Sequence, residues 1–184
     1  MKVELNEKNA LYPLPVALIG TDIDGKANFI TIAHLGIGAL DMVTLGINKA
    51  HYSNKGIITN REFSINIPSD DMVTETDYTG MVSGSKTDKS GIFKIFRGSL
   101  KHAPMIENAP VAMECTLVDH YDYKTHDLFV GKVEKIYAEE NILTNGTIDI
   151  AKVKPMLFDM HQRKYWRVGE PFADAWSIGK NYNK

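Results

Sequence analysis

The chain has 184 residues, of which 43% are hydrophobic and 24% charged, and this is the composition of an ordinary globular domain. With 21 basic and 23 acidic residues, a net charge of -2 gives no overall attraction to nucleic acid or to an anionic membrane. A single cysteine, Cys115, excludes a disulfide within the chain and a zinc site needing two of its thiolates, and it suits a reducing cytoplasm.

The beginning of the chain and its apolar windows carry no targeting or membrane signal. The first nine residues hold charges of both signs and no apolar run, unlike a secretory signal. The most apolar window, residues 35–47, contains Asp41 and falls short of the roughly 18 continuous apolar residues of a membrane span. Since no linker or repeat occurs, we expect one cytoplasmic domain over residues 1–184.

A series of short strands separated by turn signals is predicted along the chain. In order, these are residues 16–22, 28–33, 42–48, 62–67, 111–121, 127–138 and 164–168. The first two flank Asp24 and Gly25, a dipeptide typical of a tight hairpin turn. Residues 28–33 are apolar on both faces, which predicts a central strand. The alternation of residues 127–138 changes phase near Gly131, which predicts a β-bulge.

Helices are expected to be few and short. Residues 53–60, with Ser53 as the cap, and residues 69–78, with acids in the first turn, are predicted to be helical. Residues 149–154 predict a helical turn, whereas residues 80–110 show little periodicity and are expected to be mostly loop. Hairpin-connected strands with such short helices predict a mainly β antiparallel barrel, because a doubly wound parallel sheet needs longer helices between its strands.

A first candidate binding segment, residues 48–55, joins a strand end to the first short helix. Free N–H groups at a helix start, the Ser53 hydroxyl and the nearby Lys49 are the donors that a phosphate group needs. Taken alone, the same residues are more often a capped helix with solvated lysines.

Two further segments are candidates for ligand contact. The loop at residues 78–89 is dense in glycine, serine and threonine, so its backbone can approach a flat ligand closely, and Lys86 or Lys89 could hold an anion. A plain surface loop is the alternative. Thr31 is a polar residue within an otherwise apolar strand. Its side chain either only favours the strand conformation or faces the polar rim of a bound heterocycle.

Motifs for other chemistries are missing from the sequence. The six histidines do not fall at metal-ligand spacing, and Cys115 alternates with apolar neighbours as a core thiol does. No nucleophile elbow or phosphate-binding P-loop occurs, and Gly36 and Gly38 lack the third glycine of a dinucleotide fingerprint. The aromatic cluster at residues 164–169 needs an apolar cover, from the same chain or from a partner subunit.

Taken in order, these segments resemble the flavin reductase-like, FMN-binding split-barrel family, and most closely its flavoredoxin-like branch. The matching stretches are residues 15–18, 28–31, 51–54, 63–68, 77–80, 82–84, 87–89, 109–115, 126–129, 131–133, 165–166 and 169–170. The similarity covers about residues 12–170. It implies a six-stranded antiparallel Greek-key split barrel with a few short helices, a homodimer, and FMN bound near the subunit interface.

The resemblance also implies which residues contact the flavin. They are Asn28, Thr31, Ile32, Ala33, Lys49, Ser53, Asn54, Asn66, Val82, Ser83, Gly84, Lys89, Tyr165 and Trp166. In that scheme Thr31 and its backbone neighbours face the ring, and Lys49, Ser53 and Asn54 hold the phosphate. Asn66 and the loop at residues 82–89 line the ring and the ribityl chain. Tyr165 and Trp166 approach the site, from the other subunit in the dimer.

Two features depart from the family pattern. His34 stands where relatives often carry an aromatic residue such as tryptophan, so their stacking ring is absent and a wider pocket is expected. Residues 91–98 are unusually apolar and basic and have no clear counterpart, which predicts either a lid or a loop that covers the core.

The implied function is that of a flavin-dependent oxidoreductase of the flavin reductase or flavoredoxin type, with NAD(P)H or a redox protein as its partner. An alternative is an FMN-bound electron carrier that has no NAD(P)H site of its own. A barrel that binds single-stranded nucleic acid is disfavoured, because the chain is acidic and lacks a basic aromatic strand face. No metal site is predicted.

Overall fold

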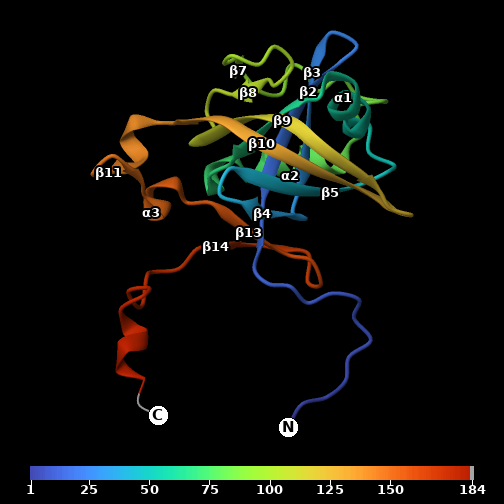
Figure 1. Cartoon of the computed structure of the whole chain (residues 1–184). Coiled ribbons are helices and arrows are strands. Elements are labelled where there is room, and N and C mark those ends of the chain that lie inside the picture. The colour runs from blue at the N-terminus through green and yellow to red at the C-terminus, as the bar shows by residue number, and fades with distance from the viewer. Residues whose placement is uncertain (183–184) are drawn as a thin grey trace.

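A curled sheet of seven antiparallel strands forms the centre of the protein, of which the computed structural model describes residues 1–182 (Figure 1). In spatial order the strands are β3 (Lys26–Ile32), β2 (Ala17–Ile23), β6 (Glu62–Ile67), β9 (Val111–Asp122), β10 (His126–Ala138), β5 (Met42–Asn48) and β4 (Leu35–Ala39). The two edge strands, β3 and β4, are consecutive in the chain, so the barrel is split between them. The predicted mainly β, antiparallel split-barrel class is confirmed, with one strand more than the expected six.

The remaining elements are short and lie around this sheet. The helices are α1 (Ser53–Asn60), α2 (Val73–Met81) and α3 (Ile150–Val153), with the 3-10 turns η1 (Asp70–Met72), η2 (Glu140–Ile142) and η3 (Ile178–Asn181). The small strands are β1 (Leu14–Pro15), β7 (Ile95–Phe96), β8 (Met105–Ile106), β11 (Leu143–Thr144), β12 (Thr147–Ile148), β13 (Met156–Asp159) and β14 (Lys164–Arg167). Helix α1, β5 and β6 have their predicted bounds, while α2 runs three residues past the predicted end at Tyr78.

The core lies inside the curled sheet. Alternate residues of β5, β6 and β10, among them Leu45, Phe63 and Phe129, are fully buried and pack together. Their inward alternation is the period-2 pattern of the sequence. Cys115 is part of this cluster, and burial raises the pKa of its thiol to about 12, so it is an inert core residue as predicted.

Two local predictions are confirmed in the hairpins. Asp24 and Gly25 both have a positive φ, at 51° and 80°, as the tight turn between β2 and β3 requires. The pairing of β9 and β10 shifts register between Val130 and Gly131, at the predicted bulge. A Cβ at Gly131 would lie 2.3 Å from Cζ of Phe63, so the core ring occupies the space that a side chain would need.

Replacing Gly131 by alanine is therefore expected to lower the free energy of unfolding by about 1–3 kcal/mol, through overpacking against Phe63. Chemical denaturation followed by circular dichroism measures this. Gly91→Ala is the matched control, because no heavy atom lies within 4 Å of a Cβ at that position. Equal stability of the two variants would contradict the packing argument.

The central placement of residues 28–33 is wrong, because β3 is an edge strand. Its residues are buried nonetheless, since α2 packs along its outer edge and Lys89 donates a hydrogen bond to the carbonyl of Phe29 at 3.0 Å. Covering by a helix and a loop gives a strand the same two-sided apolar pattern that flanking strands would give.

The segment at residues 91–98 covers the core. Phe93 is buried against the ring of Phe29, with ring centroids 5.4 Å apart in an edge-to-face arrangement. The short ribbon β7–β8 closes this segment within the stretch predicted to be mostly loop. Of the two predicted roles, the structure supports the covering loop.

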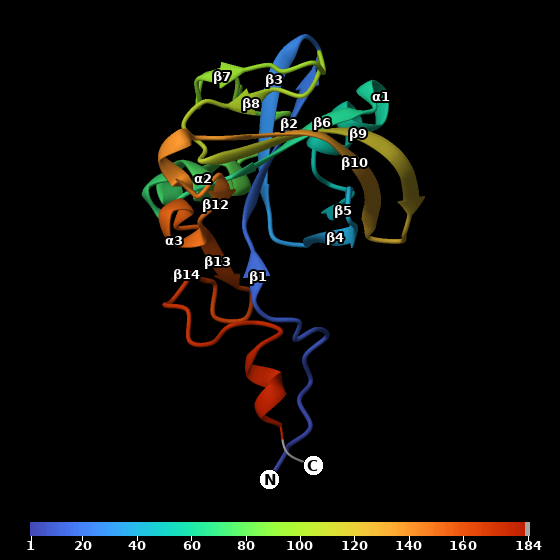
Figure 2. The ribbon, with the colours of Figure 1, turned by 60° about the vertical axis from the view of Figure 1, so that its left-hand side comes forward.

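Both chain ends leave the body on the same side, beside the small sheet β1–β13–β14 (Figures 1 and 2). We call residues 1–12 the N-terminal arm and residues 168–182 the C-terminal arm. Figure 2 shows that both arms run away from the barrel. No helix within residues 1–182 combines the length and the apolar character that crossing a membrane requires.

Candidate functional site

The edge strand β3 and the start of α1 meet in a buried polar contact. Asn28 of β3 donates from Nδ2 to Oγ of Ser53 at 2.8 Å, and both side chains are buried. Ser53 is the first residue of α1, and Tyr52 before it provides no side-chain cap, so the predicted capping role of Ser53 is wrong. At this helix start the amides of Asn54 and Lys55 donate to the carbonyls of His51 and Tyr52, each at 3.3 Å.

A buried ammonium group lies on the same edge of β3. Lys89 donates from Nζ to the carbonyls of Phe29 at 3.0 Å and of Thr79 at 2.7 Å. No carboxylate forms an ion pair with it within residues 1–182, and burial lowers its pKa to about 8. Since an ammonium has three protons and two are used here, one donor remains for a ligand.

A histidine lies near this ammonium. Burial lowers the pKa of His51, and the charges of Lys89 and His126 lower it further. The imidazole of His51 is therefore held neutral, and Lys89 is the buried charge that a bound anion would neutralise.

The loop after α2 is pressed against these residues. A Cβ at Gly84 would lie 2.1 Å from Oδ1 of Asn28 and 2.9 Å from Cδ1 of Tyr52, so only glycine allows this approach. Val82 ends α2, and Ser83 is exposed, with its hydroxyl 2.9 Å from that of Ser85. The loop walls a hollow of about 280 Å³. Its lining residues are Ile23, Asp24, Lys26, Ala27, Asn28, Tyr52, Gly84, Ser85, Lys86, Thr87, Asp88 and Lys89.

A larger and mainly apolar cavity of about 410 Å³ lies at the other end of β3. It is lined by Val16, Thr31, Ile32, Ala33, Asp77, Gly80, Met81, Phe158, Met160, Arg163 and Tyr165. The Thr31 hydroxyl donates to the carbonyl of Thr76, which fixes it against α2. Tyr165 donates to Oδ1 of Asp77 at 2.9 Å, and burial together with this bond raises the pKa of its phenol, so the group stays a neutral donor.

The two hollows share no lining residue, and we call them, together with the β3 residues between them, the β3 cleft. Lys89 and Asn28 give one end donors and positive charge, whereas Ile32 and Ala33 give the other end apolar walls. Thr31 faces Gly80 between the ends, where a Cβ on the glycine would lie 3.3 Å from Cβ of Thr31. Such a cleft suits an amphipathic molecule with a flat apolar part and an anionic group.

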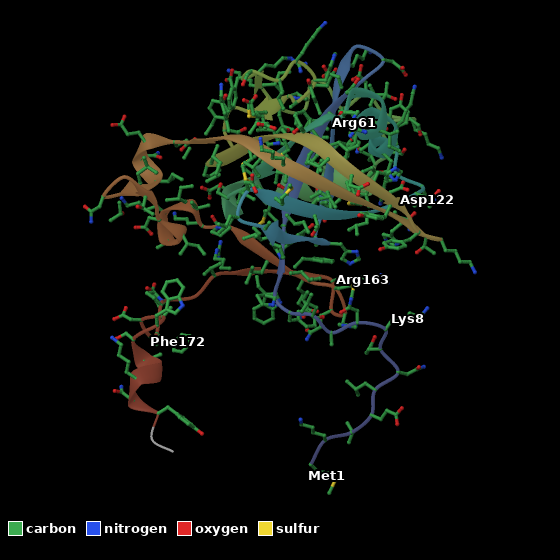
Figure 3. All side chains as sticks on the ribbon, viewed as in Figure 1. Met1, Lys8, Arg61, Asp122, Arg163 and Phe172 are labelled. Atoms are coloured by element: carbon green, nitrogen blue, oxygen red, sulfur yellow. The ribbon has the colours of Figure 1, made fainter. Side chains whose placement is uncertain are left out.

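Two of the three residues predicted to hold phosphate are engaged elsewhere. Lys49 forms an ion pair with Asp122 and lies 3.7 Å from Oδ1 of Asp127. Asn54 donates from Nδ2 to Oδ2 of Asp127 at 2.7 Å. Figure 3 shows Asp122 at the tip of the hairpin formed by β9 and β10. Only Ser53 of the predicted three is bonded to a residue of the β3 cleft.

Asn66 and Trp166 also lie apart from the β3 cleft. Asn66 is fully buried, donates to the Leu18 carbonyl and the Ser64 hydroxyl, and accepts from the Ile106 amide at 2.8 Å. Its amide is thus committed to the core. Trp166 of β14 is 54% exposed and pairs with Leu157, whereas its neighbour Tyr165 lines the larger cavity.

Sequence reasoning missed part of the lining. Asp77 lies in α2, and Gly80 and Met81, which fell within the candidate loop predicted at residues 78–89, belong to the last turn of that helix. Phe158, Met160 and Arg163 belong to the β13–β14 hairpin, whose first strand was not predicted. The run of apolar residues at 156–158, just before the aromatic cluster, could have predicted this strand. No group of three or more potential metal ligands occurs within residues 1–182.

Fold and site together define a small split-barrel protein with two hollows along its edge strand β3. The model of the flavin reductase like domain matches residues 9–167, and the chain belongs to this family. The resemblance seen in the sequence is thereby confirmed, and membership supports a flavin-associated redox function.

Solved structures with the same fold extend this finding. The chain is 41% identical to flavoredoxin from Methanosarcina acetivorans, with a TM-score of 0.95 and 98% of each chain covered. It is 31% identical to flavoredoxin of Desulfovibrio vulgaris (Miyazaki F), with a TM-score of 0.89 and 97% and 100% of the two chains covered. An FMN-binding protein from Thermus thermophilus, 24% identical with a TM-score of 0.79, shares the fold over 95% of this chain and 97% of its own.

Proposed function

We propose that this chain binds FMN in the β3 cleft and transfers electrons through it, as an oxidoreductase of the flavin reductase or flavoredoxin type. One observation carries the proposal: the buried ammonium of Lys89, which forms no ion pair within residues 1–182, lies at the polar end of the β3 cleft, and the other end of the cleft is apolar. The flavoredoxin relatives and the FMN-binding protein of the same fold support the choice of ligand.

The residues present fit such a cofactor. Lys89, Asn28 and Ser53 form a donor set for a phosphate group. Gly84 lets the loop backbone press against Asn28 and Tyr52, which places the loop beside the donors that would hold the phosphate end of the cofactor. Thr31, Ile32 and Ala33 lie where a flat ring would meet the edge of β3 and the apolar walls.

Each of these residues would act by holding or orienting. Bound FMN would supply the redox chemistry itself, which is the exchange of electrons at its ring system. Thr31, anchored on α2, would fix the position of the strand edge toward the ring. Tyr165, neutral and hydrogen-bonded to Asp77, would close the apolar end against water. No side-chain acid or base is required for hydride arrival at a flavin.

In this function the protein is a cytoplasmic homodimer. It acts either as a reductase or as an electron carrier. A reductase accepts hydride from NADH or NADPH, whereas a carrier exchanges electrons with a redox protein only. Purified protein is expected to be yellow, with a visible flavin band that bleaches on reduction. Stopped-flow mixing with NADH and with NADPH then distinguishes the two modes. Colourless protein that takes up no added FMN would overturn the proposal.

Ser53→Ala is expected to weaken the binding of FMN about 5- to 10-fold, because a hydrogen bond is worth about 1–1.5 kcal/mol. The binding of riboflavin should hardly change, because only FMN carries the phosphate. Fluorescence quenching titrations of the two flavins measure this. Lys49→Met should have a smaller effect on FMN, since its ammonium is paired with Asp122. An equal loss of both flavins on replacing Ser53 would refute this placement of the phosphate.

A further inference from the structure

Asp127 of β10 is a buried carboxylate close to the turn of the hairpin formed by β9 and β10. It is 6% exposed, its Oδ1 accepts from Nε2 of His120 at 3.0 Å, and its Oδ2 accepts from Nδ2 of Asn54 at 2.7 Å. Burial alone would raise the pKa of this carboxyl, but the hydrogen bonds from His120 and Asn54 outweigh burial and lower it. The carboxylate is therefore ionised, and each of its oxygens holds a donor from a different element.

The ring of His120 fixes Asp127 against the core. It stacks on the ring of Phe129, with the centroids 4.9 Å apart and an angle of 17° between the planes. Phe129 is fully buried in the core of the curled sheet. Since an ionised carboxylate only accepts hydrogen bonds, Nε2 of His120 carries the hydrogen that it donates. Asp127 is thus held on one side by a side chain that packing has already fixed.

On its other side, Asp127 holds the first turn of α1. Asn54 is the second residue of this helix, and its side chain is buried. Its Nδ2 also donates to the Asn48 carbonyl at 3.3 Å, whereas no donor within residues 1–182 reaches its buried Oδ1. An unpartnered buried acceptor costs free energy, so stability alone does not account for an amide at this position. The arrangement indicates that Asn54 is kept for its contact with Asp127.

Other side-chain contacts of the same turn are exposed to solvent. The Tyr52 hydroxyl and the Lys55 ammonium donate to the carboxylate of Asp24, at 3.0 Å and 2.9 Å. Bonds of this kind at the surface contribute little to holding an element in place. The buried bond between Asn54 and Asp127 therefore sets the position of the helix start.

The position of α1 matters for the polar end of the β3 cleft, because Ser53 directly precedes Asn54. The Ser53 hydroxyl accepts from Asn28 of β3 at 2.8 Å. A displacement of the first turn of α1 would separate these two side chains and change the donor set on which an anion would rest. Asp127 itself lines neither hollow of the cleft, so its effect on a ligand is indirect.

We propose that Asp127 is a positioning residue for the phosphate end of the β3 cleft, acting through Asn54 on the hydroxyl of Ser53. The identity of the ligand rests on the proposed function, whereas the path from Asp127 to Ser53 does not depend on flavin. The same path gives Asn54 an indirect role, in place of the direct phosphate contact that the family resemblance implies.

The sign of the effect separates positioning from electrostatics. A negative charge near the cleft repels an anion, so as a charge alone Asp127 would weaken phosphate binding and its removal would strengthen it. As a positioning group it supports binding, and its removal weakens binding. Asparagine at this position removes the charge but keeps the geometry. Its oxygen accepts from Asn54, and its NH2 group donates to the other tautomer of His120.

Titration of the flavin-free protein with FMN and with riboflavin tests the proposal. Asp127→Ala should weaken FMN binding about 10-fold and riboflavin binding less than about twofold, whereas Asp127→Asn should stay within about threefold of the parent for both. Tighter FMN binding by Asp127→Ala, an equal loss for the two flavins, or an equal loss in Asp127→Asn would each overturn the proposal.

Asp122→Ala is the matched control for the loss of a carboxylate. Asp122 is an exposed acid at the tip of the same hairpin, paired with Lys49 and without a bond to Asn54 (Figure 3). Its removal should change FMN binding less than about twofold, since an exposed ion pair contributes little. A loss as large as that of Asp127→Ala would contradict a specific role for Asp127.

A measurement without flavin follows the path directly. The bond to Ser53 gives the side-chain amide protons of Asn28 a distinct NMR resonance, which Ser53→Ala removes. We expect this resonance in the parent and in Asp127→Asn, and its loss in Asp127→Ala. An unchanged Asn28 resonance in Asp127→Ala would refute the path, even where the titrations agree with it.

Two further arms keep the test decisive. Asn54→Ala removes the same contact from its other end, so it should also remove the Asn28 resonance, and it replaces Asp127→Ala where that variant does not fold. An unchanged resonance in Asn54→Ala would likewise refute the path. Parent protein that takes up no FMN would refute the proposed function, and the Asn28 resonance would still decide whether Asp127 positions Ser53.

Discussion

Lys89→Met is expected to weaken FMN binding roughly 10- to 100-fold, which corresponds to about 1.5–3 kcal/mol for a lost charge-assisted hydrogen bond. The ammonium is buried and already bonded to two carbonyls, and its remaining proton has no acceptor within residues 1–182. Methionine keeps the length and the apolar stem and removes only the charge. Equilibrium titration of the flavin-free protein measures the change.

Lys86→Met is the matched control, since Lys86 lies on the same loop, lines the same hollow and is exposed. Its removal should change FMN affinity less than threefold. Riboflavin provides the second control, because Lys89→Met should hardly affect a ligand without phosphate. Similar losses for FMN and riboflavin, or for the two lysine variants, would contradict the role of Lys89.

The pH dependence of FMN binding follows from the same group. Burial lowers the pKa of Lys89 to about 8, and a bound phosphate would raise it again by favouring the charged form. A phosphate monoester with a second pKa near about 6 is already a dianion in this range. FMN affinity should therefore fall as pH rises above 8, with uptake of up to one proton per FMN bound. Lys89→Met should remove this dependence, and calorimetry in two buffers measures the uptake.

Stability of the flavin-free protein changes in the opposite direction over that window. The folded chain loses the Lys89 proton near pH 8, whereas the unfolded chain keeps it up to the ordinary lysine value of 10.5. Between these values the unfolded state binds more protons, so this group makes the free energy of unfolding rise with pH. Below pH 8 the cost of burying the charge is present in full.

Local patterns in the sequence predicted the parts of the β3 cleft that come from neighbouring residues. Asn28 and Ser53 both lie in recognisable strand and helix signals, and the glycine-rich loop contains Lys89. The local sequence could not predict that Lys49 and Asn54 bind carboxylates of the hairpin formed by β9 and β10 instead of contacting the β3 cleft. Their partners, Asp122 and Asp127, are about 70 residues away and meet them only when β10 pairs with β5.

The error on β3 has a related cause. A strand that is apolar on both faces is buried on both faces, but the pattern does not say by what. In this fold Thr76 and Thr79 of α2 and the Lys89 loop cover its edge. The strands β13 and β4 were missed because each is short, with four and five residues, and neither alternates in burial. Their positions depend on pairing with β1, β14 and β5, which is tertiary information.

Glu114→Ala is expected to destabilise the fold by about 3 kcal/mol, because a buried acceptor is lost and its donors are left unsatisfied. Glu114 is fully buried on β9 and accepts from the Ser99 hydroxyl at 2.6 Å, the Leu100 amide at 3.0 Å and the Tyr137 hydroxyl at 3.2 Å. Burial alone would raise the pKa of this carboxyl, but these hydrogen bonds outweigh burial and lower it.

The loop held by Glu114 connects stability to the β3 cleft. It leads into the ribbon β7–β8 and the covering residue Phe93, whose ring packs on Phe29, and the Phe29 carbonyl holds Lys89. A folded Glu114→Ala variant should bind FMN within about threefold of the parent, since Glu114 lines neither hollow of the β3 cleft, but it should unfold at lower denaturant concentration.

Acid sensitivity gives a second readout of the same carboxylate. Its pKa is lower in the folded state than the ordinary 4.5, so its contribution is present above that value and is lost as pH falls through the folded pKa. Glu114→Ala should therefore flatten the loss of stability on acidification. Glu134→Ala, which removes an exposed carboxylate bonded to Thr116 and Lys132, should leave both the denaturation midpoint and the acid profile close to the parent. If both variants were as stable as the parent, the buried carboxylate would have no structural role.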